Sequence, residues 1–320
     1  CRLFNKNPYF MKKIYIIAGE ASGDLHGSNL MKGLYAEQPD VEIRFWGGEK
    51  MAAVGGTMVS DYRDCAVMGI TDVITKAPKL MSNLERCKLD IIRFSPDAVV
   101  LIDYPGFNLK IARFAHSRGI KVFYYIAPKV WASREWRVRQ LRRYVDKLFI
   151  IFPFEIPYFT KRHIDFIYKG NPLIDSIDNS PAMSVTREVF LAENNLPDKP
   201  YIALLAGSRK GEIRRMMPVL GTVVAELKKL PEYADCGFVV AGAPSRSISD
   251  YSGYIKDSSV RVIFGKTKEI VRHAEAAVVN SGTASLETVL LGTPQVVCWS
   301  TRAFTAFVAR HILRVMSHIK

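Results

Sequence analysis

Short apolar segments recur along the whole chain, and longer amphipathic segments separate them. Apolar runs without polar alternation are typical of strands buried on both faces of a parallel sheet. The expected strands are 14–18, 98–102, 121–126, 148–152, 201–206, 237–241, 260–264 and 276–279. The clearest helical patterns lie at 24–37, 108–118, 134–147, 210–230 and 283–292. This alternation predicts an α/β protein with parallel sheets and right-handed crossovers.

Turn-forming residues collect between 170 and 200, in GNPLIDSIDNSPAMS and NNLPDKP. A chain of 320 residues is long enough for two domains with separate cores. We therefore expect two doubly wound, Rossmann-like domains that face a cleft, at 11–172 and 173–320. A single (β/α)8 barrel is the alternative fold. Residues 1–10 precede MKKIYII, so we expect Met11 to be the natural start and 1–10 an upstream extension.

The formal net charge of +14 is large for a chain with 48% hydrophobic residues. The basic excess is greater before residue 172 than after it, which suits nucleic acid, an anionic membrane surface or a phosphorylated substrate. No RNA-binding or helix-turn-helix pattern accompanies the charge, so nucleic acid is disfavoured. No apolar run is long enough to span a bilayer, and no signal peptide is visible. The five cysteines are scattered without C-x-x-C spacing, which favours a reducing compartment and argues against zinc.

Two turns in the second half have the form of an anion site. Gly207, Ser208 and Arg209 follow an expected strand and precede a helix that we expect to begin near Glu212. Helix-start N–H groups and a guanidinium together suit a diphosphate, although a plain strand-to-helix turn is the alternative. The second turn has the same form and comprises Ser281, Gly282 and Thr283, with Glu287 one turn into the next helix. We expect Thr283 or Ser285 to cap that helix and Glu287 to accept hydrogen bonds from a ribose.

Asp103 ends an otherwise apolar strand, so we expect it at the carboxyl edge of the first sheet, where ligands bind in open α/β folds. Its apolar flanks favour a raised pKa and a role as general base. The alternative is a turn aspartate ahead of Pro105. No Asp-x-Asp pair ends a strand, so a metal-held diphosphate is not suggested, and no serine or cysteine nucleophile arrangement is evident.

The first strand leads into AGEASGDLHG, where the glycines are spaced G-x-x-x-G-x-x-x-G rather than G-x-G-x-x-G. Acidic residues in this loop would repel a phosphate, so we expect a turn that faces sugar hydroxyls. A purely structural cap at Asp24 is the alternative for that residue. The residues of this expected acceptor-side loop are Gly19, Glu20, Ser22, Gly23 and Asp24.

A basic stretch with interleaved tryptophans spans 128–147. Val138, Leu141, Val145 and Leu148 have the spacing of one buried helical stripe, which leaves the arginines outside it. A solvated helix face is the simple interpretation, and a patch for anionic lipid or a phosphorylated substrate is the sharper one. The residues of this expected patch are Lys129, Trp131, Arg137, Arg139, Arg142 and Arg143. The basic, aromatic end at 302–320 also has the composition of a membrane-surface segment.

Six motifs in order, AGEASGDLHG, MGITDVI, LIDYPGFN, YYIAPKVWA, LLAGSRKGEI and SGTASLETVLLGTP, resemble the lipid-A-disaccharide synthase family over almost all of 11–310. The resemblance implies a GT-B fold with the acceptor site in the first domain and the nucleotide-sugar site in the second. It implies an inverting transfer from UDP-2,3-diacylglucosamine to 2,3-diacylglucosamine 1-phosphate (lipid X). The expected products are the lipid A disaccharide 1-phosphate and UDP. It also implies a cytoplasmic enzyme held peripherally on the inner membrane, and we expect no cofactor and no metal.

On this resemblance Asp103 is the expected base, Arg209 stabilises the departing UDP and Glu287 holds the ribose. The family usually has proline where Ala206 stands. It also continues beyond the helix expected at 302–315 with a segment that contains an active-site asparagine. This chain diverges there, so we expect a truncated C-terminal domain and, if 320 residues are the whole product, weak or no activity. Two alternatives stay open: another GT-B UDP-sugar enzyme, and a truncated non-catalytic nucleotide-binding module.

Overall fold

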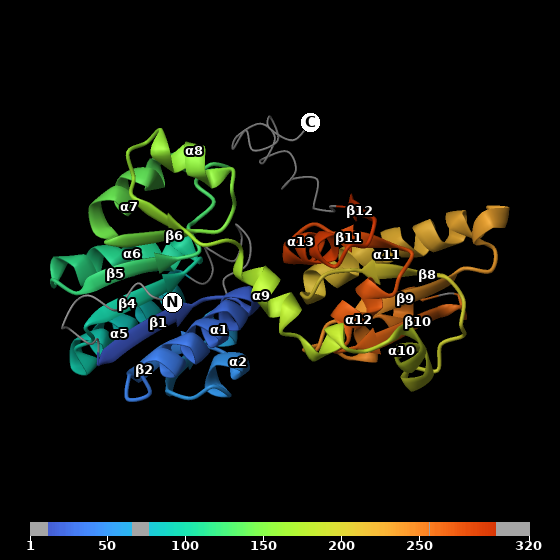
Figure 1. Ribbon diagram of the computed structural model, residues 1–320, viewed down its shortest axis with the longest axis horizontal. Helices are drawn as coiled ribbons and strands as arrows, with labels where there is room; N and C mark the ends of the chain where they lie inside the picture. Colours follow the sequence, from blue (N-terminus) through green and yellow to red (C-terminus); the bar gives the residue numbers. More distant parts are fainter. Residues whose placement is uncertain (1–11, 66–76, 256, 299–320) are drawn as a thin grey trace. The chain divides into compact units, whose positions relative to one another are not determined.

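The computed structural model describes residues 12–65, 77–255 and 257–298 (Figure 1). The chain divides into two compact units, Cys1–Pro172 and Leu173–Lys320. The expected extension with Met11, the motif at 68–74 and the basic end at 302–320 lie outside the described residues.

The first unit is built on a sheet of seven parallel strands in the order β3-β2-β1-β4-β5-β6-β7. The strands are β1 Lys13–Ala18, β2 Glu42–Gly47, β3 Thr57–Asp61, β4 Ala98–Ile102, β5 Lys121–Tyr125, β6 Lys147–Ile150 and β7 Phe166–Tyr168. The order reverses between β1 and β4, which pair in register from Ile14 with Ala98 to Ala18 with Ile102. This doubly wound order has its topological switch point between those two strands.

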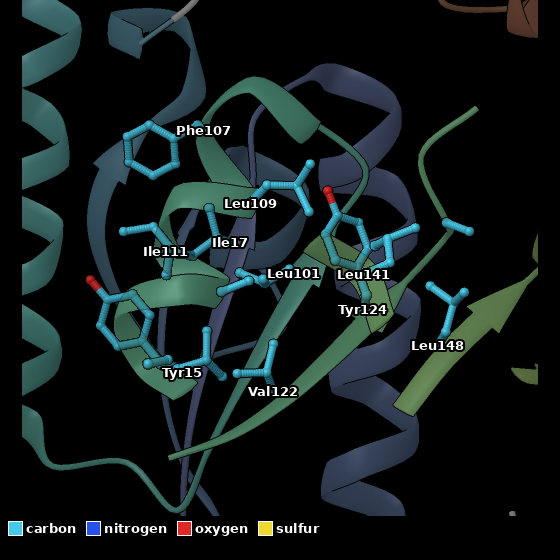
Figure 2. Close-up of a cluster of buried hydrophobic side chains, with 14 of the residues drawn as sticks. Tyr15, Ile17, Leu101, Phe107, Leu109, Ile111, Val122, Tyr124, Leu141 and Leu148 are labelled. Carbon is cyan, nitrogen blue, oxygen red and sulfur yellow. The ribbon is translucent and has the colours of Figure 1, made fainter. Parts of the chain in front are cut away.

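Helices cover both faces of this sheet because successive side chains of each strand point to opposite faces. The helices are α1 Ala21–Glu37, α2 Glu49–Ala52, α3 Tyr62–Cys65, α5 Ala77–Phe94, α6 Pro105–Ser117, α7 Val138–Tyr144 and α8 Glu155–Thr160. Tyr15 and Ile17 of β1 pack in one core with α5, α6 and α7, whereas Ile14 and Ile16 pack in another with Met31 of α1. Figure 2 shows the first of these cores, where α6 lies against the sheet. All five residues of β4 are buried, as the unalternating apolar pattern predicts.

The second unit repeats the same plan with five parallel strands in the order β10-β9-β8-β11-β12. The strands are β8 Tyr201–Leu205, β9 Gly237–Gly242, β10 Val260–Phe264, β11 Ala276–Asn280 and β12 Gln295–Cys298. The helices are α9 Pro172–Asp178, which begins at the boundary, α10 Arg187–Glu193, α11 Lys210–Leu227, α12 Thr267–Arg272 and α13 Thr283–Leu290. The order reverses between β8 and β11, so this unit has its own switch point. Two parallel, doubly wound units confirm the expected GT-B-type α/β fold and exclude the single barrel.

The eight expected strands are all present, with ends that differ by one or two residues. Four strands were not expected: β2, β3, β7 and β12. The helix expected at 134–147 is wrong in part, because α7 is short and Val145 has extended backbone. Leu148 lies in β6, so the apparent helical stripe combines two elements. Helix α1 begins at Ala21, three residues earlier than expected.

Within the part of the chain that the structure describes, no helix is long and apolar enough to cross a membrane.

Candidate functional site

The predicted loop residues lie at the two switch points, whereas the predicted basic patch follows β5 in the first unit. In the first unit, the loop after β1 contains Glu20 and the loop after β4 contains Asp103, and these strands are neighbours. In the second unit, Gly207 follows β8 and Ser281 follows β11, which are neighbours as well. Parallel strands end at the same edge of a sheet, and the crevice beyond their carboxyl ends at a switch point is where open α/β folds bind ligands.

Asp103 is held in an unusual backbone conformation. Its φ is 42° and that of Tyr104 is 45°, so two consecutive residues other than glycine are left-handed. The Tyr124 hydroxyl and the Asn108 amide donate to the backbone oxygen of Asp103 at 2.7 and 2.8 Å. Ile126, after the neighbouring strand β5, also has a positive φ, of 66°. Such conformations persist only where the surroundings impose them, and they concentrate at active sites and ligand clamps.

The environment of the Asp103 carboxyl raises its pKa to about 6, mainly through burial and next through repulsion from Glu20. Lys129, the backbone N–H of Tyr104 and Arg137 act in the opposite direction and hold the pKa from rising further. A carboxyl with this pKa is mostly ionised at neutral pH and is still basic enough to accept a proton. The role of Asp103 as general base stays a prediction.

Arg137 departs from its prediction. We expected it outside the buried face of a helix, but it ends a short 3-10 helix, Glu135–Arg137, and is half-buried. Burial and the nearby Arg134 lower the pKa of its guanidinium, whereas Tyr124 and Asp103 raise it. Its Nε is buried and has no hydrogen-bond partner among the described residues. A turn at Arg134, where φ is 56°, and the 3-10 helix replace the first turns of the expected helix.

The remaining arginines of the expected patch do not join this group. Arg142 donates to the backbone oxygen of Arg162, and the Arg143 guanidinium lies 5.6 Å from the centre of the Tyr144 ring. Arg139 is exposed on α7. The structure therefore divides the patch into two groups. The charges of Lys129 and Arg137 lower the pKa of Asp103, and the arginines of α7 are exposed on the surface.

The acidic loop after β1 contacts the Asp103 loop through Gly19. A side-chain carbon built on Gly19 would lie 2.3 Å from the Tyr104 ring, so only glycine lets this ring approach. The Tyr104 ring in turn stacks on Phe107, with centroids 5.7 Å apart. Glu20 is exposed and acts on the Asp103 carboxyl. Gly23 is buried and Ser22 half-buried at the start of α1.

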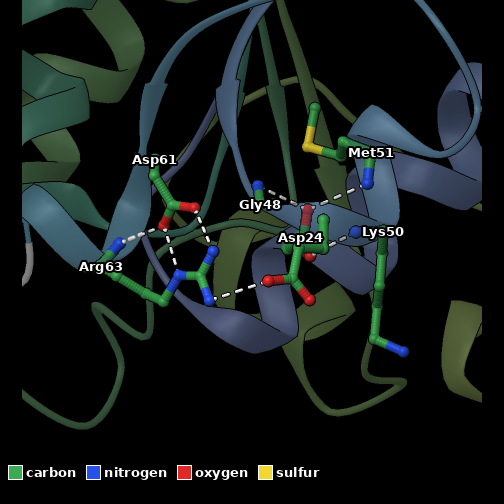
Figure 3. Close-up of polar contacts among 7 residues, drawn as sticks. Asp24, Gly48, Lys50, Met51, Asp61 and Arg63 are labelled. Carbon is green, nitrogen blue, oxygen red and sulfur yellow. Dashed lines mark hydrogen bonds and ion pairs between the residues drawn. The ribbon is translucent and has the colours of Figure 1, made fainter. Parts of the chain in front are cut away.

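Asp24 has a structural role in this molecule. One carboxylate oxygen accepts from the backbone N–H groups of Gly48 and Met51 at 2.7 and 3.1 Å, and the other accepts from Lys50 at 3.1 Å (Figure 3). The side chain is 3% exposed. These bonds close the start of α2, whereas the alternative that we weighed was a cap on α1 itself. The expected sugar contact gains no support at Asp24.

In the second unit, Gly207 and the start of α11 form a compact turn. Gly207 has a φ of 98°, and a side-chain carbon there would lie 2.5 Å from Glu212 and 2.8 Å from the Asn280 amide. The backbone N–H groups of Ser208 and Arg209 donate to Glu212 Oε2 at 3.1 and 3.2 Å. Arg209 Nη1 donates to Oε1 at 3.1 Å. A carboxylate thus occupies the N–H groups that we predicted for a diphosphate, and α11 begins at Lys210, where the helical pattern 210–230 begins.

The second predicted turn lies at the start of α13. Ser281, Gly282 and Thr283 are exposed, and Glu287 is half-buried. Gly282 is the N-cap residue and no side chain caps the helix, so the expected cap by Thr283 or Ser285 is wrong. Ser285 Oγ instead donates to the backbone oxygen of Gly282 at 2.7 Å. Contact between Gly207 and Asn280, the last residue of β11, places this turn beside the start of α11.

Three residues near the site were not anticipated from the sequence, two of them around Asp103 and one beside Lys129. Arg134 repels Arg137, and Tyr124 holds the Asp103 backbone, but an arginine in a basic stretch and a tyrosine inside a strand carry no distinct signal. Glu155 is the third, and it is 1% exposed. Pro153 and Phe154 separate Glu155 from the apolar run 148–152, whereas Asp103 directly follows its own run, so Glu155 has no comparable signal in the sequence.

Comparison with known proteins gives one consistent result. The family model described as lipid-A-disaccharide synthetase matches residues 14–318. A lipid-A-disaccharide synthase of Syntrophus aciditrophicus is 37% identical over 307 residues, which cover 95% of this chain and 79% of that protein. The corresponding protein of Geobacter metallireducens is 36% identical over 309 residues, covering 95% of this chain and 78% of that protein.

Solved structures agree on the fold. The UDP-GlcNAc 2-epimerase of Neisseria meningitidis, with UDP-GlcNAc bound, is similar with a TM-score of 0.65 and 15% identity, covering 93% of this chain and 85% of that one. The S. aureus MnaA–UDP structure is similar with a TM-score of 0.66 and 15% identity, covering 93% and 82%. At this identity the likeness concerns the fold alone. On its sequence, with the motifs gathered at two switch points, the chain belongs to the lipid-A-disaccharide synthetase family and is a hexosyltransferase.

Proposed function

We propose that this protein transfers 2,3-diacylglucosamine from its UDP donor to 2,3-diacylglucosamine 1-phosphate (lipid X). The products are the β-1,6-linked disaccharide 1-phosphate and UDP. The observation that carries the proposal is Asp103, a carboxyl with a pKa of about 6 at a switch point, beside two cations. Family membership supplies the class of reaction, and this geometry supplies a base for it.

In the acceptor half of the reaction, Asp103 takes the proton from the 6-hydroxyl as that oxygen attacks the anomeric carbon of the donor. Attack from the face opposite UDP inverts the anomeric centre. The acceptor phosphate binds Lys129 and Arg137, because a guanidinium with a buried, unpartnered Nε gains a strong charge-assisted bond from a phosphate oxygen. The Glu20 carboxylate accepts hydrogen bonds from the sugar hydroxyls. Backbone groups of Gly19, Ser22 and Gly23 make further hydrogen bonds to these hydroxyls.

In the donor half, the diphosphate binds the backbone N–H groups of Gly207, Ser208 and Arg209 and displaces the Glu212 carboxylate from two of them. The start of α11 and the Arg209 guanidinium then stabilise the charge that develops on departing UDP. The turn at Ser281, Gly282 and Thr283 binds the rest of the nucleotide, and Glu287 accepts from the ribose hydroxyls. No metal ion and no cofactor enter this scheme.

The substrates are membrane lipids, so we propose that the enzyme works on the cytoplasmic side, held peripherally on the inner membrane. The exposed Arg139 on α7 and the cation-rich surface around it favour anionic headgroups. Attachment of this kind weakens with salt, because surface charges are screened over about 10 Å at 0.1 M.

The reaction itself is tested by incubating the full-length protein with both substrates and measuring the disaccharide and UDP by mass spectrometry. We expect equal amounts of both products, and none without the acceptor. The Arg209→Ala variant should need more UDP donor for half-maximal rate. Release of UDP without the acceptor, or absence of disaccharide, would contradict the proposal.

A further inference from the structure

Three aromatic side chains form a small exposed surface beside the Asp103 site, which we call the aromatic ledge: Trp131, Phe152 and Phe154. The Trp131 and Phe154 rings meet edge to face with centroids 4.8 Å apart, and Phe152 stacks on Phe154 at 5.1 Å. Trp131 is 38% exposed and Phe154 51% exposed. Large aromatic rings that share an exposed surface are typical of a binding surface rather than of solvated positions.

The ledge is held in place by a buried carboxylate. Glu155, at the start of α8, accepts from the indole Nε1 of Trp131 at 3.3 Å and from the backbone N–H groups of Ile151 and Phe152 at 3.1 and 3.0 Å. One side chain thus fixes Trp131 and the backbone that carries Phe152 and Phe154. A buried acid is costly to maintain, and here it ties two loops of one sheet edge together.

The ledge adjoins one cation of the site, Lys129. Lys129 stands two residues before Trp131, and its charge acts on both Asp103 and Glu155. An anion-binding group and an apolar surface therefore lie next to each other along the carboxyl edge of the first sheet. This pairing matches an amphiphile that carries a phosphate on a sugar and apolar chains beyond it.

We propose that the aromatic ledge binds an acyl chain of the sugar-phosphate acceptor, so that Trp131 and Phe154 set the preference for acylated acceptors. The inference rests on the proposed function for the identity of the acceptor. It adds a second contact to that site: the phosphate is bound by cations and the chain by aromatic rings. Glu155 is a positioning residue, because it acts through Trp131.

The test measures acceptor binding without donor, so that it does not depend on turnover. Calorimetric titration compares 2,3-dihexanoyl- with 2,3-diacetylglucosamine 1-phosphate, both of which dissolve without vesicles. We expect Trp131→Ala and Phe154→Ala each to weaken binding of the hexanoyl compound about tenfold, since about 60 Å² of lost apolar contact corresponds to that factor. Binding of the diacetyl compound should change less than about twofold on the same argument.

Two further variants sharpen the result. Phe154→Leu keeps an apolar side chain and should retain most of the hexanoyl preference. Leu89→Ala, which truncates a side chain that is 54% exposed on α5, should bind both compounds as the parent protein does.

Equal weakening of binding for both compounds would overturn the inference, and so would no change for either. If the ledge variants instead lose only sedimentation with phosphatidylglycerol vesicles, the surface contacts the membrane and the proposal is wrong. Absence of disaccharide formation with hexanoyl preference intact would count against the proposed function and leave the ledge standing.

Discussion

At the residue scale, two features of Asp103 lower the stability of the folded protein, and an aspartate with only a structural role would have neither. Its backbone is left-handed, and its carboxyl is buried with Glu20 nearby, which raises the pKa to about 6. An aspartate whose pKa is higher in the folded than in the unfolded chain binds protons more tightly when folded. Stability therefore falls as the pH rises from 3.8, the ordinary value, through about 6.

Replacement Asp103→Asn removes this charge and keeps the shape. At pH 8 we expect the variant to be more stable to unfolding than the parent by about 3 kcal/mol, from the size of the pKa shift. The gain should vanish near pH 3, where the aspartate is protonated in both the folded and the unfolded chain. Urea unfolding of the first unit at the two pH values measures it. A variant that is destabilised at pH 8 would show that the charge itself supports the fold.

Gly19 tests the contact between the two loops of the first switch point. An alanine there would place a carbon 2.3 Å from the Tyr104 ring, so the ring next to Asp103 must move. We expect Gly19→Ala to lose about 1–3 kcal/mol of stability, as overpacking does, and most of the transfer activity.

Gly33→Ala in α1 is the matched control for this change, because nothing lies within 4 Å of the added carbon. That variant should be at least as stable as the parent, since alanine favours a helix interior over glycine by about 0.5–1 kcal/mol. Thermal unfolding and a transfer assay on both variants decide the matter. Similar activity losses in the two would mean that the Tyr104 contact is irrelevant.

At the element scale, a carboxylate from the first turn of α11 accepts the hydrogen bonds at the start of that helix. Glu212 accepts from the N–H groups of Ser208 and Arg209 and from the Arg209 guanidinium. A diphosphate at the same N–H groups has to displace this carboxylate. The turn therefore holds an internal competitor for the proposed donor.

Glu212→Gln removes the competing charge and keeps an oxygen that accepts hydrogen bonds. We expect the variant to bind UDP about threefold to tenfold more tightly, which corresponds to about 1 kcal/mol of charge-assisted bonding. Loss of the carboxylate near the helix N-terminus should lower its stability by about 0.5–1 kcal/mol. Calorimetric titration with UDP and thermal unfolding measure the two effects. Weaker UDP binding would indicate that Glu212 organises the turn for the nucleotide instead of competing with it.

Some elements were predictable from the sequence and others were not, for physical reasons. Buried parallel strands such as β4 give continuous apolar runs, so the fold class and Asp103 at a strand end followed directly. Strand β2 has the sequence EIRFWG, in which Glu42 and Arg44 interrupt the apolar run, and β7 has three residues. Neither strand has an apolar sequence pattern that distinguishes it from the neighbouring residues. The stripe at 138–148 misled because Val145 follows α7 with extended backbone and Leu148 is buried in β6, so neither continues the helix.

At the scale of the whole molecule, the two units share one design. Each has a parallel sheet whose strand order reverses once, and the predicted residues follow the two strands at that point. Sequence motifs placed Asp103 and Gly207 at strand ends. The contacts of Tyr124 and Arg137 with Asp103 depend on side chains from other elements and were not predictable from spacing, whereas Glu212 lies in the same turn as Gly207.

The central claim is that Asp103 is the base of a sugar transfer to a lipid acceptor. The pH dependence of kcat/KM for disaccharide formation, compared between the full-length protein and Asp103→Asn, tests it most directly. We expect kcat/KM to rise through a pKa of about 6 and to level off above it, and we expect the variant to lose nearly all activity while it still binds UDP. A variant with near-parental rates and the same rise near pH 6 would contradict the claim.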